Sequence, residues 1–262
     1  MIFTAETLNT KLKQDHSDVA HYDSGSRLVL CDGIGEFEDS QRYSETVVDE
    51  FVKEKYSTLK KLCSSNALSE LKKTTTGGTT VITAQRKKSK SDKLNIQYLG
   101  NGGALHLGGD FNENIISDFP YRYHSLLLPH INKDGKLIRF ISHNSGAKEE
   151  KVSRVDLTLN NPFGDLVMFY TDGISSLEDR MIIQDESEDR RYWRHESSDI
   201  QYILQSLTSF LRECDYESFE DEFRKFSKTV LKDIHKVTPF DDDASIGFVV
   251  TQEFVEYHKG KK

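Results

Sequence analysis

Three apolar runs of the chain each have aspartate at one end. The runs are rich in Val, Leu, Ile and aromatic residues, and they are 28–31 before Asp32, 166–170 before Asp172, and 244–250 after Asp241, Asp242 and Asp243. Runs of this length and composition predict buried strands. Each aspartate therefore stands where a core strand meets solvent.

Two further regions carry apolar residues at the spacing of an amphipathic helix. Residues 39–71 contain neither Gly nor Pro, and their apolar positions predict one or two helices. Residues 200–211 and 219–234 repeat Ile, Leu, Phe and Val at the same spacing, which predicts two more helices.

Short strands and turns account for most of the remaining sequence. Polar and apolar residues alternate over 18–32 around a turn at 23–26, which predicts a hairpin. Residues 79–84 and 93–99 predict a second hairpin, whose basic tip at 86–90 we interpret as solvated rather than as a docking patch. Further strands are expected at 104–107, 126–128, 137–141 and 152–159.

The order of these elements predicts an α+β fold. Strands, a helical region, many strands, two helices and a final strand do not form a regular βαβ alternation. Only 4 Pro occur, and no linker rich in Pro, Gly or Ser interrupts the chain. We therefore expect one domain over residues 1–252, a polar frayed tail over 253–262, and a solvated mixed-charge loop over 178–191.

The composition excludes several classes of protein. A formal net charge of -8 argues against a nucleic-acid-binding protein, which usually needs a basic face. No stretch approaches the roughly 20 apolar residues of a membrane span, and the start lacks a basic segment followed by an apolar one. The 3 Cys are widely spaced, which suits free thiols in a reducing compartment. We expect a cytoplasmic protein that binds neither nucleic acid nor membrane.

The aspartates at the strand ends carry the candidate chemistry. Taken singly, an Asp-Gly pair after a strand is more often only a turn. Carboxylates brought together without counter-charges repel each other and lose hydration, so such a group is tolerated mainly when divalent cations lie between its members. Convergence of Asp32, Asp172 and Asp242 therefore predicts a metal centre.

Six short motifs follow one another along the chain. They are Lys13-Gln14-Asp15-His16, Asp32-Gly33-Ile34-Gly35, Gly77-Gly78-Thr79-Thr80, Gly100-Asn101-Gly102-Gly103, Thr171-Asp172-Gly173 and Asp242-Asp243-Ala244-Ser245. In this order they resemble the metal-dependent serine/threonine protein phosphatases of the type 2C group (the PPM family), bacterial branch. The resemblance extends from about residue 9 to residue 250.

The resemblance implies a fold, a reaction and a set of site residues. The implied fold is a four-layer αββα sandwich, in which two antiparallel sheets pack together with helices on both outer faces. Asp32 would bridge two Mn²⁺ or Mg²⁺ ions, the Gly33 carbonyl would bind one ion, and Asp172 and Asp242 would bind the other. A hydroxide between the ions would hydrolyse phosphoserine and phosphothreonine on proteins, without a covalent intermediate. The implied partners are a phosphorylated protein and a cognate serine/threonine kinase.

Other acidic and polar residues are candidates for supporting roles. Under the resemblance Asp15 either binds an ion or acts through a water molecule. Glu36, Asp243 and Asn101 are further candidates, either as ion ligands or as residues that contact the ligands. Of the 9 His, only His16, adjacent to Asp15, is a candidate for a supporting role, and the others are interpreted as surface or core residues.

Several positions depart from the family pattern. Thr10 stands where the family usually has a phosphate-binding Arg; Lys11 or Lys13 supplies charge there, but not the bidentate fork of a guanidinium. Asn101 replaces the acid that binds a third, looser ion, so we expect two ions and a weak or absent third site. The segment 108–151, where the family has a substrate-facing flap, shows no residue-level match.

Two other functions stay open because of these departures. One is a catalytically weak or inactive type 2C-like protein that acts as a phosphoprotein-binding or regulatory module. The other is a phosphatase for a different phosphorylated substrate, such as a small molecule. Both alternatives have the same fold. In the first the site hydrolyses little or no substrate, and in the second it hydrolyses a different one.

Overall fold

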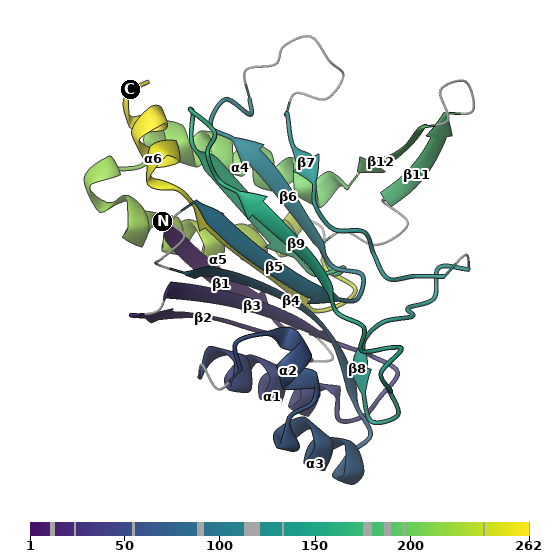
Figure 1. Ribbon diagram of the computed structural model, residues 1–262. Helices are drawn as coiled ribbons and strands as arrows, with labels where there is room; N and C mark the ends of the chain where they lie inside the picture. Colours follow the sequence, from purple (N-terminus) through teal and green to yellow (C-terminus); the bar gives the residue numbers. More distant parts are fainter. Residues whose placement is uncertain are drawn as a thin grey trace.

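Two antiparallel β-sheets pack face to face, with helices on both outer faces (Figure 1). The computed structural model describes residues 1–10, 14–23, 25–53, 56–87, 92–112, 121–132, 134–174, 180–185, 190–195, 197–237 and 239–261. The expected α+β sandwich is confirmed. None of the helices in these ranges is long and apolar enough to cross a membrane.

The first sheet has the order β1-β13-β10-β6-β7, and all its neighbouring strands are antiparallel. These strands are β1 (Ile2–Leu8), β13 (Ala244–Val250), β10 (Asp165–Tyr170), β6 (Gly103–Gly108) and β7 (His124–Ser125). The outer face of this sheet is covered by α4 (Ser198–Glu213), α5 (Phe219–Val237) and α6 (Gln252–Lys259), with a short 3-10 turn, η1 (Tyr216–Ser218), between α4 and α5.

The second sheet has the order β2-β3-β4-β5-β9, and β8 pairs with the start of β4. Its strands are β2 (His16–Tyr22), β3 (Gly25–Gly33), β4 (Gly78–Lys87), β5 (Lys93–Leu99), β9 (Ser153–Thr158) and β8 (Ile141–Ser142). The helices α1 (Ser40–Val52), α2 (Leu59–Cys63) and α3 (Asn66–Thr74) cover its outer face (Figure 1).

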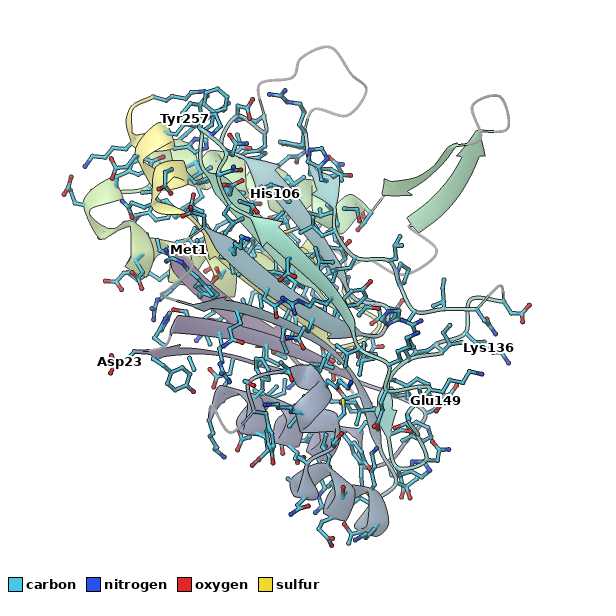
Figure 2. All side chains as sticks on the ribbon, viewed as in Figure 1. Met1, Asp23, His106, Lys136, Glu149 and Tyr257 are labelled. Atoms are coloured by element: carbon cyan, nitrogen blue, oxygen red, sulfur yellow. The ribbon has the colours of Figure 1, made fainter. Side chains whose placement is uncertain are left out.

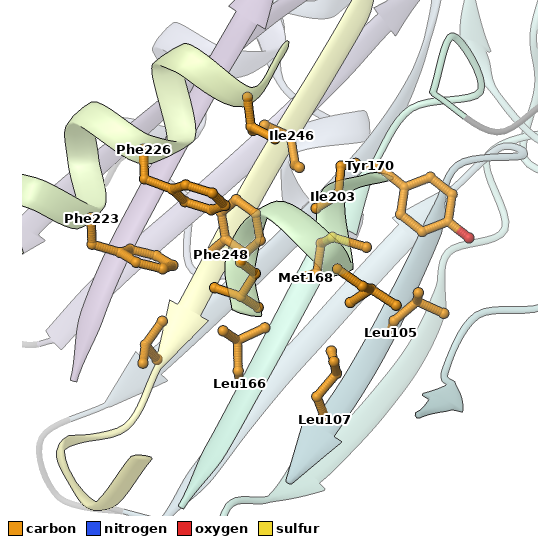
Figure 3. Packing of buried hydrophobic residues seen from close by; sticks show 14 of the residues in the cluster. Leu105, Leu107, Leu166, Met168, Tyr170, Ile203, Phe223, Phe226, Ile246 and Phe248 are labelled. Atoms are coloured by element: carbon orange, nitrogen blue, oxygen red, sulfur yellow. The ribbon is translucent and has the colours of Figure 1, made fainter. Parts of the chain in front are cut away.

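Three hydrophobic layers hold the sandwich together. One lies between the two sheets, one between the second sheet and α1 to α3, and one between the first sheet and α4 to α6. In the last layer Phe223 and Phe226 of α5 pack against Phe248 of β13, with ring centroids 5.3 and 6.2 Å apart (Figure 3). Successive residues of a strand point to opposite faces, and both faces of the central strands are covered. This double burial explains why those strands read as uninterrupted apolar runs.

Several elements differ from the expectation. The helical region 39–71 contains three helices, because Thr58 and Ser65 each cap a new one with the side-chain oxygen. Residues 126–128 are not a strand, and of 137–141 only Ile141 lies in one. The strand β1 was not expected, and it pairs with β13 along its whole length.

The expected frayed tail is instead a helix. Thr251 caps α6 by accepting a hydrogen bond from the Phe254 amide, and Phe254, Val255 and His258 are buried against the first sheet layer. A hydrophobic contact surface of this kind outweighs the polar composition of residues 253–262.

The mixed-charge segment also contains regular structure. β11 (Arg180–Asp185) and β12 (Arg190–His195) form a two-stranded antiparallel ribbon, so the expectation of a loop was wrong for these residues. In Figure 1 this ribbon projects from the body of the molecule. Arg86 and Lys87, expected in a hairpin tip, belong to β4, and residues 88–90 lie outside the described ranges.

Candidate functional site

Three of the predicted site residues meet at one end of the sandwich. Asp32 is the next-to-last residue of β3, Asp172 follows β10, and Asp15 precedes β2. The Asp32 carboxyl lies within hydrogen-bonding reach of both Asp15 and Asp172. β2 and β3 are joined by a turn at Asp23, which is labelled in Figure 2. The three aspartates lie at the other end of β3.

Asp15 is the most enclosed of the three. Its side chain is 2% exposed, and its Oδ2 accepts hydrogen bonds from Thr171 Oγ1 at 3.1 Å and Ser245 Oγ at 3.0 Å. Its Oδ1 is buried and has no hydrogen-bond partner among the described residues. Burial, followed by the nearby charges of Asp172 and Asp243, raises the pKa of Asp15 to about 7.

Asp32 lies in the same environment. Burial raises the pKa of Asp32 well above its usual range, and the charges of Asp172 and Asp15 raise it further. Thr80 Oγ1 on the neighbouring strand β4 donates to Asp32 Oδ2 at 3.3 Å. Asp32 is thus fixed by its strand pairing while its carboxyl faces two like charges.

Asp172 and Asp242 form the outer part of the group. Asn101 Nδ2 donates a hydrogen bond to Asp172 Oδ2. Asp242 is half-buried; burial raises its pKa, and so does the charge of Asp172. Asn101 therefore donates a hydrogen bond that orients Asp172, and it does not take the place of a carboxylate ligand.

Asp243 ties the N-terminal segment to the site. It is 2% exposed; its Oδ1 accepts from the Thr10 amide at 2.6 Å and from Thr10 Oγ1 at 3.1 Å, and its Oδ2 accepts from the Gln14 amide at 2.5 Å. Both oxygens are engaged, so this carboxylate serves as an anchor for the chain on either side of residues 11–13. Lys11 and Lys13, the expected phosphate-binding residues, lie outside the described residues.

The glycines after two of the aspartates are required by packing. A Cβ at Gly33 would overlap the side chain and backbone of Gln14, and a Cβ at Gly173 would overlap the backbone of Asp243. The Asp-Gly pairs therefore let the chain segments that carry Asp15 and Asp243 approach the ends of β3 and β10. This packing is a structural reason for the two glycines that is independent of any bound ion.

Two predicted residues stand apart from the group. Glu36 is exposed in the turn after β3, and no hydrogen bond or ion pair between it and the aspartates is found in the described ranges. His16 lies in β2 opposite Cys31, and no hydrogen bond or ion pair from its ring to the aspartates is found in the described part of the chain. The hydroxyls of Thr80, Thr171 and Ser245 were not predicted as site residues, although each lies inside or next to one of the six motifs.

The group has the donor types of a hard-cation site. In the ranges that the structure describes, no Lys, Arg or His forms an ion pair with Asp15, Asp32 or Asp172. Carboxylate and carbonyl oxygens suit Mg²⁺ and Mn²⁺. Among the described residues, however, no three His, Cys, Asp or Glu side chains surround a common point as metal coordination requires.

Comparisons with known proteins place the fold in a recognisable class. No known family profile and no curated protein sequence matches the chain. Solved structures do match: the serine/threonine phosphatase Stp1 from Staphylococcus aureus has 13% identity and a TM-score of 0.62, with 96% of each chain covered. A bacterial serine phosphatase has 13% identity and a TM-score of 0.58, with 95% of this chain and 96% of that chain covered.

A third structure with this fold comes from an animal. A sex-determining protein of C. elegans has 13% identity and a TM-score of 0.63, with 98% of this chain and 66% of that chain covered. At identities this low the matches establish a shared fold. The protein thus has the α+β sandwich of serine/threonine phosphatases, with a group of buried aspartates at one end.

Proposed function

We propose that the protein is a metal-dependent phosphatase that hydrolyses phosphoserine and phosphothreonine on proteins. The observation that carries the proposal is that the Asp32 carboxyl lies beside those of Asp15 and Asp172, while no ion pair joins a cation from the described residues to any of the three. Two like unit charges about 4 Å apart repel by about 4 kcal/mol at an effective dielectric constant of about 20. A fold that keeps three such groups together needs protons or external cations to offset this repulsion.

The residues present supply holding and positioning functions. Asp32, Asp172, Asp242 and the Gly33 carbonyl would hold two Mn²⁺ or Mg²⁺ ions. When bound, such a pair of ions lowers the pKa of a water molecule towards neutrality and polarises the phosphoryl oxygens. Thr80 keeps Asp32 oriented and Asn101 keeps Asp172 oriented, because each donates to one carboxyl oxygen.

Asp15 and the N-terminal segment would act on either side of this centre. Thr171 and Ser245 hold one oxygen of Asp15, and its other oxygen is available to a water molecule or an ion. Asp243 holds the backbone on both sides of Lys11 and Lys13, which would supply positive charge for the substrate phosphate. The phosphorylated protein would be the product of a serine/threonine kinase.

A second candidate function is a regulatory module that binds phosphoproteins without turnover. Two observations favour it: Thr10 stands where the resemblance expects an Arg, and Thr10 is engaged by Asp243 instead of facing a substrate phosphate. In the described part of the chain, moreover, no three His, Cys, Asp or Glu side chains are placed to hold a metal ion. The two functions differ in turnover, not in fold.

Activity with and without metal tests the proposal. The purified chain with Mn²⁺ should hydrolyse para-nitrophenyl phosphate and a phosphothreonine peptide, and excess chelator should abolish both reactions. Asp32→Ala should remove activity with an unchanged circular dichroism spectrum. Asp156→Asn, in an exposed aspartate of β9, is the matched control and should keep full activity. Binding of the phosphopeptide without turnover at any metal concentration would favour the regulatory module.

A further inference from the structure

His130 holds both polar groups of one residue, Gly100, beside the aspartate group. The His130 amide donates to the Gly100 carbonyl at 2.8 Å, and the Gly100 amide donates to His130 Nδ1 at 3.1 Å. The His130 side chain is 7% exposed. Backbone and ring of one residue therefore fix the position of Gly100.

The hydrogen bonds of the ring define its tautomer. Burial, together with the positive charge of Arg139, lowers the pKa of His130 to about 4, so the imidazole is neutral at physiological pH. Nδ1 accepts from Gly100, so the proton is on Nε2, from which it is donated to Ser153 Oγ at 2.8 Å. Arg139 Nη1 lies 3.3 Å from Nε2 and 3.0 Å from Ser153 Oγ. Because Nε2 carries the proton and has no free lone pair, the guanidinium donates to Ser153 Oγ and not to the ring. The ring stacks on Tyr98 with centroids 4.6 Å apart, which leaves it little freedom to rotate.

Gly100 in turn lies next to the donors of two aspartates. Its φ is +119°, a conformation that favours glycine, and a Cβ there would overlap the side chain of Thr80. Thr80 is the donor to Asp32, and the residue after Gly100, Asn101, is the donor to Asp172. A shift of Gly100 therefore moves the donors of two aspartates at once.

We infer that His130 is a positioning residue, which holds the Gly100–Asn101 turn so that Asn101 and Thr80 orient Asp172 and Asp32. This inference rests on the proposed function for its catalytic consequence. That His130 fixes the position of Gly100 does not depend on whether the protein hydrolyses a substrate. His130 touches neither substrate nor the reacting atoms, so its loss acts through the geometry of the aspartates.

A pair of substitutions separates the hydrogen bond from the rest of the side chain. His130→Asn places an amide oxygen near the position of Nδ1 and keeps an acceptor for the Gly100 amide. His130→Gln places its polar group near Nε2 and removes that acceptor. Both substitutions remove the stacked ring, so they share any general loss of packing. Exposed His124 provides a control in His124→Gln.

Three measurements on these variants test the inference. In His130→Gln, amide hydrogen exchange at Gly100 should accelerate about tenfold. The affinity for Mn²⁺ by calorimetry and kcat for the phosphopeptide should each fall about tenfold or more, with KM unchanged. His130→Asn should retain most of the Gly100 protection, Mn²⁺ affinity and kcat, and His124→Gln should match the wild type.

Equal Gly100 exchange in His130→Asn and His130→Gln would overturn the inference, and so would wild-type Mn²⁺ affinity in His130→Gln. If exchange and Mn²⁺ affinity change as expected while the wild type hydrolyses no substrate, the positioning role stands and the proposed function fails. The exchange measurement therefore distinguishes the two failures.

Discussion

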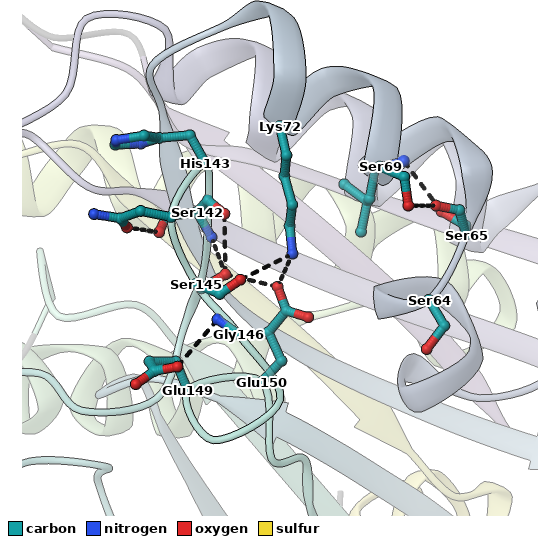
Figure 4. Close-up of polar contacts among 12 residues, drawn as sticks. Ser64, Ser65, Ser69, Lys72, Ser142, His143, Ser145, Gly146, Glu149 and Glu150 are labelled. Carbon is teal, nitrogen blue, oxygen red and sulfur yellow. Dashed lines mark hydrogen bonds and ion pairs between the residues drawn. The ribbon is translucent and has the colours of Figure 1, made fainter.

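Two acidic sites of the molecule are built in opposite ways. Glu150, with a side chain 11% exposed, forms an ion pair with Lys72 of α3, and Ser145 Oγ donates to its Oε1 at 2.6 Å (Figure 4). Lys72 also donates to the Ser145 carbonyl at 3.4 Å. At the other site Asp32 faces Asp15 and Asp172, and the described residues provide hydroxyl and amide donors but no cation.

One acid has a cation from the protein itself as its partner, and the aspartates do not. Glu150 and Lys72 neutralise each other, so this pair joins α3 to the loop after β8 and needs nothing from outside. Burial raises the pKa of Asp15 and of Asp32, and the charge of Asp172 raises both further, so these two acids carry a cost in the metal-free protein that a bound cation offsets. Substitutions at the two sites should therefore change stability in opposite directions.

The largest expected effect is on activity at Asp32. Asp32→Asn should lower kcat by at least about 100-fold, because a ligand shared by two ions loses its charge. The same substitution should raise the melting temperature of the metal-free protein at neutral pH, since Asn is neutral without the proton that buried Asp32 must bind on folding. Phosphopeptide hydrolysis and thermal unfolding in chelator check the two effects. Retained activity, or a lower melting temperature in chelator, would show that the like charges do not control this site.

The pH dependence of stability should also distinguish the aspartates. The pKa of Asp15 is about 7 in the folded chain and about 3.8 when unfolded, so the folded state retains a proton that the unfolded state releases. The contribution of Asp15 is fully present below about pH 4 and is lost as the pH rises through about 7. The melting temperature in chelator should therefore fall between about pH 4 and about pH 7 more steeply in the wild type than in Asp15→Asn. Identical slopes for the two proteins would count against the buried proton.

At the Glu150–Lys72 pair, substitution should lower the stability of the fold and leave catalytic activity unchanged. Lys72→Met leaves the carboxylate of Glu150 without its cation and should lower the free energy of unfolding by about 2 kcal/mol, less than the value for a fully buried pair because both side chains are partly exposed. The double variant Lys72→Met with Glu150→Gln should recover part of this loss. Urea unfolding measures the three proteins, and kcat should stay within about twofold of wild type.

The smallest expected effect concerns the anchor at Asp243. Asp243→Asn keeps the shape of the side chain but gives up a charged acceptor for the Thr10 and Gln14 amides, at a cost of about 1 to 2 kcal/mol. Affinity for Mn²⁺ should change less than in Asp32→Asn, because the Asp243 oxygens are already engaged by the N-terminal segment. A larger loss of Mn²⁺ binding than in Asp32→Asn would make Asp243 a ligand instead.

Much of the fold was predictable because double burial leaves a clear pattern in the sequence. The strand that carries Asp32 sends Leu28 and Leu30 between the sheets and Val29 and Cys31 towards α1 to α3, so the whole run is apolar. Elements buried on one side, or short, were missed. In β1 Thr4 and Glu6 weaken the pattern, and in α6 only a few side chains face the core.

The candidate site was predictable only in part. The order of motifs predicted that Asp32, Asp172 and Asp242 converge, with Asp15 beside them. The Asp32 carboxyl lies beside those of Asp15 and Asp172, and Asp242 stands in the outer part of the group, near Asp172. The partners of Asp243 were not predictable, because Thr10 and Gln14 are 233 and 229 positions away along the chain. The role of Asn101 as a donor depends in the same way on a contact with Asp172 that only the fold creates.

Calorimetric titration with Mn²⁺ at about pH 7.5 tests the central claim most directly. The account predicts saturable binding in the wild type, release of protons on binding, and at least about a tenfold weaker affinity in Asp32→Asn than in the control Asp156→Asn. Absence of Mn²⁺ binding to the folded wild type, or equal affinity in these two variants, would contradict it.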